Sequence, residues 1–239
     1  MGFLPVSSGI IPGLVNFLYP AACPACSMPP DSLSHAPFCR KCWQGIRHYD
    51  GPSCSICGVP LVSVHADRCR HCLEAPPAFT SAVSFGLYDG VLASAIHHFK
   101  FLGIRRLSKP LSALMFFYNT TNAEAIVPVP LSPDGLKNRG FNQALLLAYQ
   151  LSKRKKVPLL MDVLAKITDT PPQIGLSAKE RSANVRKAFT CRKKLPGMSI
   201  LLIDDVMTTG ATVNACSKEL LKAGARDVFV LTLSRAGLG

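Results

Sequence analysis

The sequence predicts an α/β protein, in which a parallel sheet flanked by helices follows a small N-terminal zinc-binding domain. Two patterns carry this prediction. Four Cys-x-x-Cys pairs lie within residues 23–72, and a strand–loop–helix–strand pattern lies within residues 200–233. The chain has 239 residues, 48% of them hydrophobic. It is therefore long enough for one larger and one smaller domain, and too apolar for a disordered chain.

The first eight cysteines have the spacing of zinc ligands. The loop between the first two pairs is twelve residues long, and the loop between the last two is eleven. Each Cys-x-x-Cys turn directs two thiolates at one ion, and two turns complete a closed tetrahedral site that leaves no position for catalysis. We expect two structural Zn²⁺ ions, whose ligands are Cys23, Cys26, Cys39, Cys42, Cys54, Cys57, Cys69 and Cys72.

The pairing of these turns stays open at this point. Sequential use of the turns is the simplest arrangement, and an interleaved arrangement is the alternative. Disulfides in a secreted protein are a second alternative. A site of three cysteines and one histidine is a third, although we expect His35, His48, His65 and His71 at the surface. Residues 20–78 are rich in Pro and Gly and short of aliphatic runs, so we expect zinc to replace a missing core.

The N-terminal segment predicts a docked helix over residues 1–19, because four of its aliphatic residues recur at helical spacing. It has no positively charged start, and two prolines interrupt it, so we do not expect a signal peptide. No apolar run of about 18 residues stands out, so no membrane insertion is expected. A cytoplasmic location, where thiols stay reduced, agrees with zinc binding.

Charge divides the chain. The formal net charge is +13, yet residues 1–78 hold five Lys/Arg and four Asp/Glu. The positive field therefore belongs to residues 79–239, which we expect to form the second domain. Its basic segments could contact the phosphates of a nucleic acid; they are Lys153–Lys156, Lys187 and Arg192–Lys194. Basic domains bind nucleic acid, phosphorylated ligands or nothing in particular, so charge alone does not decide between them.

Hydrophobic periodicity locates the elements of this second domain. Alternating or continuous apolar runs predict strands, and apolar residues three and four apart predict helices. The expected strands cover residues 82–88, 125–129, 200–203 and 228–233, and the expected helices cover 91–99, 145–151 and 213–220. Cys191 and Cys216 fit no zinc site, and we expect reduced core residues there.

The sharpest motif spans residues 200–212. Four aliphatic residues predict a strand buried on both faces, and two carboxylates, Asp204 and Asp205, follow at its C-terminal end. A loop of small and hydroxyl residues then leads into a helix, where free N–H groups can hold a phosphate. This loop consists of Thr208, Thr209, Gly210, Ala211 and Thr212. The acids would repel a phosphate, so we assign them to sugar hydroxyls.

Residues 200–212 resemble the signature with which type I phosphoribosyltransferases bind 5-phosphoribosyl 1-pyrophosphate (PRPP). The chain as a whole resembles the ComF family, including its ComFC-type and GntX-like members. This resemblance rests on the double cysteine turns and on several further segments. These are His98–Phe101, Val127–Pro130, Lys137–Gln143 and the stretch from Pro171–Gln173 through Arg181 and Asn184 to Phe189.

The resemblance implies roles for particular residues. Val127–Pro130, including Val129, is similar to the pyrophosphate loop of the fold. Lys100, Arg139 and Arg181 would neutralise the pyrophosphate, which binds with Mg²⁺. Residues 166–188 resemble a mobile flap that closes over PRPP. The expected fold is thus a type I phosphoribosyltransferase-like parallel sheet behind a double zinc ribbon.

The resemblance also implies a biological role, with alternatives that stay open. ComF relatives act in natural transformation, where they handle incoming single-stranded DNA with a helicase partner and the competence machinery. PRPP would be either a sensed ligand or the substrate of an active transferase whose acceptor the sequence does not reveal. A GntX-like metabolic role is a further alternative.

Overall fold

The computed structural model describes residues 22–116, 118, 123–167 and 188–236. The expected N-terminal helix and nearly all of the expected flap, including Arg181 and Lys187, lie outside these residues. The strands are β1 (Ser81–Leu87), β2 (Ala125–Pro128), β3 (Leu164–Lys166), β4 (Phe189–Cys191), β5 (Ser199–Met207) and β6 (Asp227–Arg235). The helices are α2 (Arg40–Gln44), α3 (Arg70–Glu74), α4 (Gly90–Lys100), α5 (Ser108–Phe116), α6 (Pro133–Arg139), α7 (Gln143–Lys155) and α9 (Ala211–Lys222), with a 3-10 turn η1 (Arg105–Leu107).

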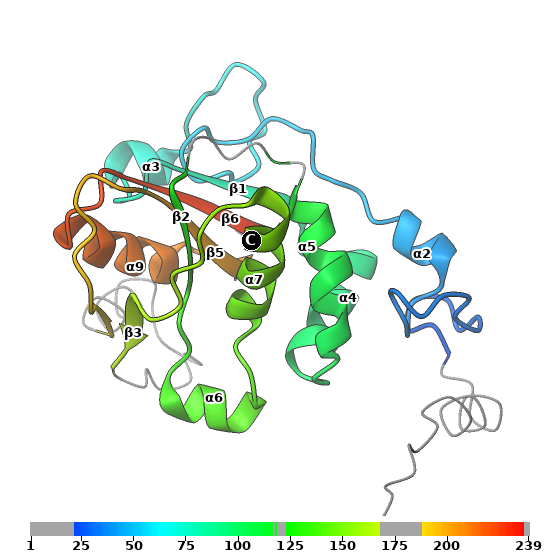
Figure 1. The fold of residues 1–239 in the computed structure, drawn as a ribbon. Helices are drawn as coiled ribbons and strands as arrows, with labels where there is room; N and C mark the ends of the chain where they lie inside the picture. Colours follow the sequence, from blue (N-terminus) through cyan, green and yellow to red (C-terminus); the bar gives the residue numbers. More distant parts are fainter. Residues whose placement is uncertain (1–21, 117, 119–122, 168–187, 237–239) are drawn as a thin grey trace, which may run out of the picture.

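The main sheet has the strand order β1-β6-β5-β2, and all its pairings are parallel. This confirms the predicted parallel sheet flanked by helices (Figure 1). The central strand β5 is longer than predicted: it continues through both aspartates to Met207. β3 and β4 form a separate antiparallel pair.

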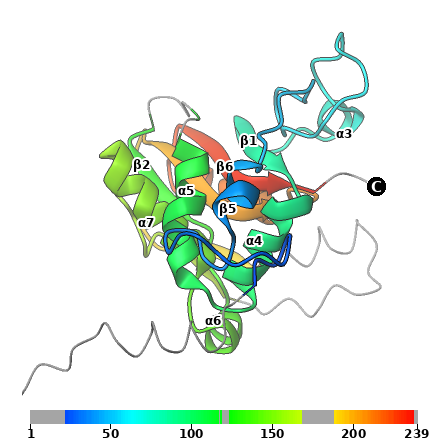
Figure 2. The same ribbon diagram turned by 90° about the vertical axis from the view of Figure 1, so that its right-hand side faces the viewer.

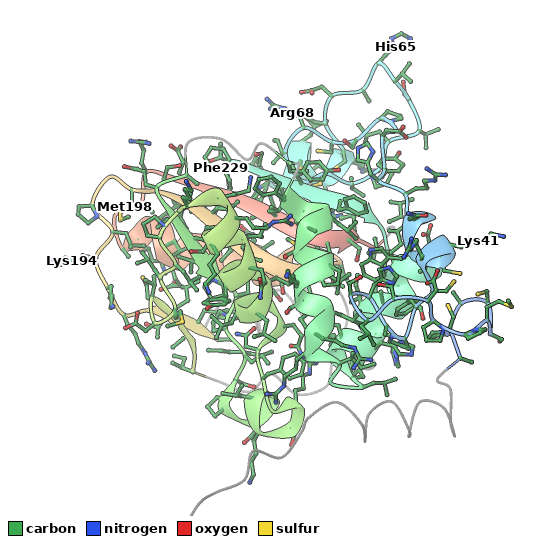
Figure 3. The ribbon with its side chains drawn as sticks, turned by 45° about the vertical axis from the view of Figure 1, so that its right-hand side comes forward. Lys41, His65, Arg68, Lys194, Met198 and Phe229 are labelled. Carbon is green, nitrogen blue, oxygen red and sulfur yellow. The ribbon has the colours of Figure 1, made fainter. Side chains whose placement is uncertain are left out.

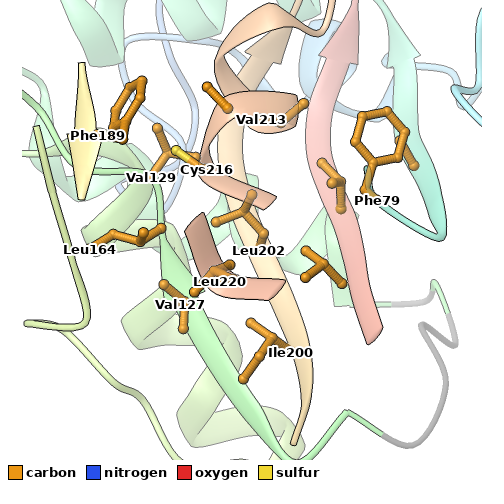
Figure 4. Close-up of a cluster of buried hydrophobic side chains, with 14 of the residues drawn as sticks. Phe79, Val127, Val129, Leu164, Phe189, Ile200, Leu202, Val213, Cys216 and Leu220 are labelled. Atoms are coloured by element: carbon orange, nitrogen blue, oxygen red, sulfur yellow. The ribbon is translucent and has the colours of Figure 1, made fainter. Parts of the chain in front are cut away.

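Alternate side chains of β5 enter two hydrophobic cores, one on each face of the sheet. Ile200 and Leu202 pack with residues of α9, and Leu201 and Ile203 pack with residues of α4, α5 and α7. Figure 4 shows the first core, in which Cys216 of α9 lies among aliphatic side chains. Cys216 is fully buried, as predicted, whereas Cys191 is only half-buried on β4.

The two cysteine units dock on opposite faces of the sheet (Figures 1 and 2). In the first, Phe38 packs edge-on against His98 of α4, and Arg106 Nε donates to the carbonyl of Ala36 at 3.0 Å. In the second, the Ile56 carbonyl accepts from the amide of Ala82 in β1 at 2.7 Å. Its outer loop, with the labelled His65 and Arg68, projects away from the sheet (Figure 3).

The expectation that His35 lies at the surface is wrong. Its ring is buried and stacks on Trp43, and its Nδ1 lies 2.9 Å from the carbonyl oxygen of Phe38. The first cysteine unit has few aliphatic side chains to fill its interior. The His35 ring can fill it because its polar nitrogen has a hydrogen-bond partner. Within the described ranges, no helix is long and apolar enough to span a bilayer.

Candidate functional site

A cavity of about 530 Å³ lies at the C-terminal ends of β2 and β5, which is where open parallel sheets bind ligands. It brings together seven of the residues that the sequence singled out: Lys100, Val129, Arg139, Asp204, Asp205, Thr208 and Thr212. These residues come from α4, the segment after β2, α6, β5 and the loop before α9. They are widely separated along the chain, and the fold brings them around one opening.

The two acids differ in environment. Asp204 is half-buried, whereas Asp205 is 5% exposed and forms an ion pair in which Lys100 Nζ lies 2.8 Å from its Oδ2. The Asp205 Oδ1 atom also accepts the amide of Val206 at 2.9 Å. Lys100, which was predicted to neutralise a pyrophosphate, pairs with Asp205 in this structure. Oδ1 also accepts from Lys100 Nζ at 3.2 Å, whereas Oδ2 has the ion pair with Lys100 but no hydrogen-bond partner among the described residues.

Burial and the neighbouring Asp205 carboxylate raise the pKa of Asp204 to about 8, and Lys100 only partly opposes them. A like charge nearby and loss of hydration both disfavour the ionised form. At neutral pH Asp204 is therefore largely protonated. In this form its carboxyl group can both donate and accept a hydrogen bond to a hydroxyl group.

Asp204 should make the stability of the protein depend on pH. Its pKa of about 8 in the folded chain exceeds the ordinary value of 3.8, so the folded state binds more protons between these values. Stability should consequently be greatest at low pH for this group and fall as the pH rises through 8. Asp204→Asn should remove this loss, so the stability of the variant relative to wild type should increase from about pH 5 to pH 9. Urea unfolding at a series of pH values measures it, and parallel pH profiles for both proteins would contradict the assignment.

The loop before α9 has the form of an anion site. Gly210 is the N-cap residue of α9, with a left-handed φ of 80° and no side chain to cap the helix; the Thr209 hydroxyl accepts the Ala211 amide at 3.4 Å. Unsatisfied N–H groups at such a terminus attract anions. Thr208 and Thr212 face the large cavity, whereas Thr209, Gly210 and Ala211 line a second cavity of about 260 Å³ on the other side of the loop. The sequence did not predict this division.

Gly210→Ala should distort this loop. A Cβ atom at this position would lie 2.7 Å from the Met207 Cε atom, on a backbone with positive φ. We expect a loss of roughly 1–3 kcal/mol in the free energy of unfolding and weaker binding of phosphate-bearing ligands. Thermal unfolding and phosphate titration measure the two effects. Gly197→Ala is the matched control, because Gly197 also has a positive φ, of 68°, but a Cβ atom there would have no described atom within 4 Å. Equal effects on ligand binding in both variants would contradict the loop assignment.

The wall opposite the acids is held by backbone and amide contacts. The Val129 amide donates to the Ile203 carbonyl at 2.9 Å, and the Val129 carbonyl accepts from Asn142 Nδ2 at 3.0 Å. Asn142 also caps α7 by accepting the amide of Leu145. The Arg139 guanidinium stacks over the exposed Phe101 ring, 5.5 Å from its centroid. This wall therefore offers a fixed cation beside the pyrophosphate segment that the sequence predicted.

Sequence reasoning missed four further residues that line the cavity: Tyr88, Phe101, Lys166 and Phe189. Phe101 lies in the segment that carries Lys100, and Lys166 begins the expected flap. The sequence therefore singled out their segments but gave these two residues no function. Phe189 ends the last segment of the family resemblance and Tyr88 ends an expected strand, but no pattern in the sequence gave either residue a role at the site.

The two cysteine clusters have the geometry of four-thiolate zinc sites. Their sulfur atoms lie within 4.8 Å of one another, in the sets Cys23, Cys26, Cys39, Cys42 and Cys54, Cys57, Cys69, Cys72. The Cys26–Cys39 and Cys57–Cys69 sulfur distances are 3.6 and 3.7 Å. Tetrahedral ligands at a Zn–S distance of about 2.3 Å would be roughly 3.8 Å apart. The residues fit zinc, and the pairing is sequential rather than interleaved.

The thiols also receive local support. The Cys39 and Cys69 sulfur atoms cap α2 and α3 by accepting the amides of Cys42 and Cys72 at 3.5 Å. Such N–H···S contacts orient metal-binding thiolates. Both clusters consist of cysteines, so the alternative with a histidine ligand is not the arrangement found.

Comparison with known proteins agrees with this architecture. Residues 14–73 match the model of the double zinc ribbon domain. Competence protein F of Haemophilus influenzae is 34% identical over 83% of this chain and 90% of its own length. DNA utilization protein YhgH of Escherichia coli is 33% identical over 90% and 97%, and competence protein ComFC of Bacillus subtilis is 30% identical over 83% and 84%.

Solved phosphoribosyltransferases also share features with the chain. Glutamine PRPP amidotransferase from B. subtilis matches with a TM-score of 0.37 and 19% identity, over 52% of this chain and 25% of its own. Purine phosphoribosyltransferase from Pyrococcus horikoshii matches with a TM-score of 0.30 and 12% identity, over 64% and 85%. The sequence relatives, with at least 30% identity over most of both chains, are decisive: the chain belongs to the ComF family.

Proposed function

We propose that the chain binds PRPP in the large cavity and that this binding serves the use of incoming DNA. One observation carries the proposal: the acid pair of β5 borders the same 530 Å³ cavity as Thr208 and Thr212, which flank the N-terminus of α9. Sugar hydroxyls suit the acids, and a phosphate suits the helix terminus. The names of the relatives, competence protein F and DNA utilization protein, supply the biological context.

Each part of PRPP then has a place. The 5′-phosphate lies against residues 208–212, and the ribose hydroxyls lie on Asp204 and Asp205. The pyrophosphate lies beside Val129 and Arg139, with Arg181 as a further predicted cation outside the described residues. Lys100 would exchange Asp205 for the pyrophosphate as the ligand enters. This exchange would release the Asp205 carboxylate for the ribose.

Turnover is the second step of the proposal. An acceptor would attack the anomeric carbon while pyrophosphate departs, and Lys100 and Arg139 would stabilise the charge on the leaving group. Mg²⁺, bound with the pyrophosphate, would supply further positive charge. The acid pair would hold the ribose in orientation. If no acceptor exists, the same contacts make PRPP a sensed ligand.

Calorimetry of the zinc-loaded protein tests the binding proposal. PRPP with Mg²⁺ should bind more tightly than ribose 5-phosphate or pyrophosphate alone, because only PRPP occupies all three parts of the cavity. Equal affinity for PRPP and pyrophosphate would contradict the ribose and phosphate assignments. Release of pyrophosphate in the presence of candidate acceptors would separate a transferase from a sensor.

A basic groove supports a second candidate function, binding of single-stranded DNA. The groove has a volume of about 480 Å³ and lies between the first cysteine unit, at Leu33 and Ser34, and helices α5 and α7. Its cations are Arg106, Lys109, Lys153 and Arg154. Lys155 was predicted to contact phosphates with the rest of its run, but its Nζ donates to the carbonyls of Phe116 and Tyr118. A helicase or other competence partner would meet the protein in the same compartment, which we predict to be the cytoplasm.

Lys109→Met with Lys153→Met should weaken binding of single-stranded DNA. Removal of two phosphate contacts should reduce the slope of log affinity against log salt by roughly 1.4, at about 0.7 per contact. Gel shifts over a salt series measure this slope. Arg192→Met with Lys194→Met is the control, since these exposed cations do not line the groove. An equal loss in both double variants would contradict a defined groove.

A further inference from the structure

The smaller cavity joins the second cysteine cluster to the back of the phosphate loop. Its lining includes Cys57, Cys69 and Cys72 on one side and Thr209, Gly210 and Ala211 on the other. Arg235, the last residue of β6, also lines it. The proposed function places no part of the ligand in this cavity, so the position of Arg235 between a metal cluster and the back of the loop requires an explanation.

Arg235 is held in place by the sheet. It pairs in register with Met207, the last residue of β5, and its carbonyl accepts the amide of Tyr88 beyond β1. The residue is 3% exposed. Its Nη2 lies 3.9 Å from the Cys57 sulfur, and a Cβ atom on Gly210 would lie 4.0 Å from its Nη1. The guanidinium therefore lies between the cluster and the loop.

The electrostatics of this position are unusual. Within the part of the chain that the structure describes, Arg235 Nε and Nη1 have no hydrogen-bond partner. A buried guanidinium without a countercharge is strongly destabilising. A cluster of four thiolates and one Zn²⁺ carries a net charge of about −2. This charge would compensate the buried guanidinium of Arg235. Burial lowers the pKa of Arg235, and the nearby cysteine sulfurs act in the opposite direction.

We propose that Arg235 is a positioning residue that couples the second zinc site to the phosphate loop. Its Nη2 edge compensates the charge of the zinc–thiolate cluster, and its Nη1 edge supports the loop at Gly210. The cluster thereby fixes a positive charge behind the loop that receives the 5′-phosphate. The effect of Arg235 on phosphate affinity rests on the proposed function. Its effects on zinc retention and on the order of residues 207–212 do not depend on it.

Three measurements on the full, zinc-loaded chain test this coupling. Arg235→Met keeps most of the side-chain volume and removes the charge; Arg235→Lys keeps the charge. Arg226→Met is the matched control, because Arg226 is 60% exposed and pairs with Asp227 at the surface. The measurements are zinc release to a chelating dye, hydrogen–deuterium exchange of residues 207–212, and calorimetry with PRPP.

In Arg235→Met, one of the two zinc ions should leave about 10-fold faster, because groups that contact metal ligands help to retain the metal. The 207–212 amides should exchange faster, and PRPP affinity should fall about 5-fold or more. Arg235→Lys should release zinc at a rate closer to wild type, and Arg226→Met should match wild type throughout.

The outcomes separate the two proposals. Wild-type rates of zinc release and amide exchange in Arg235→Met would overturn the coupling, whatever the ligand data show. Failure of the wild-type protein itself to bind PRPP would overturn the proposed function, while faster zinc release and exchange in the variant would still uphold the coupling.

Discussion

Replacing Asp204 and Asp205 together by asparagine should weaken PRPP binding by about 100-fold or more. A hydrogen bond to a charged group contributes roughly 1.5–3 kcal/mol and one between neutral groups roughly 0.5–1.5 kcal/mol, so replacing the ionised Asp205 and the protonated Asp204 together should cost about 3 kcal/mol. Asparagine keeps the shape of each side chain, which limits disturbance of β5. Calorimetry with PRPP and Mg²⁺ measures the loss.

The ligand and a second variant provide the controls for this prediction. Pyrophosphate alone should bind the double variant at least as well as wild type, because the variant removes negative charge beside its site and frees Lys100 from Asp205. Asp162→Asn, at an exposed acid that pairs with Lys193, should leave PRPP binding unchanged. Unaltered PRPP affinity in the double variant would remove the ribose assignment.

Loss of the second zinc site should destabilise the whole chain more than loss of the first. Cys54, Cys57 and Cys72 are buried in the same core as α9 and the side chains of β5 and β6 that face it. Structural zinc contributes about 10–16 kcal/mol in small sites, so Cys57→Ser with Cys72→Ser should lower the melting temperature by more than about 10 °C. Metal analysis should find one zinc per chain.

The corresponding variant of the first site is the comparison. Cys26 is exposed and Cys42 is half-buried, so Cys26→Ser with Cys42→Ser should also leave one zinc per chain but cause a smaller shift in melting temperature. Both shifts are measured by thermal unfolding of proteins whose metal content is known. Equal shifts, or two zinc ions in either variant, would contradict the packing account.

Local patterns in the sequence sufficed for the four strands of the main sheet and for both cysteine clusters, but not for α5, α6 or the β3–β4 pair. The aliphatic run at residues 200–203 identified the central strand, because a strand buried on both faces is a continuous run of apolar residues rather than an alternation of apolar and polar ones. The Cys-x-x-Cys spacing identified both zinc clusters because the turn geometry is set within four residues. The loop after the acids was recognised because a glycine and hydroxyl residues mark the start of α9.

Contacts between distant residues could not be predicted in this way. The pairing of Lys100 with Asp205 depends on how α4 packs beside β5, and no local pattern encodes that distance. The burial of His35 arises from its packing on Trp43 within the first cysteine unit, and the position of Arg235 beside Cys57 arises from docking of the second unit on the sheet. The division of the phosphate loop between two cavities has the same origin, because its second face is formed by a unit much earlier in the chain.

A crystal structure of the zinc-loaded protein with PRPP and Mg²⁺ tests the central claim most directly. The account predicts the 5′-phosphate against residues 208–212, the ribose hydroxyls on Asp204 and Asp205, and Lys100 turned from Asp205 toward the pyrophosphate. An occupied cavity with the phosphate elsewhere, or the Lys100–Asp205 ion pair intact beside bound PRPP, would contradict it.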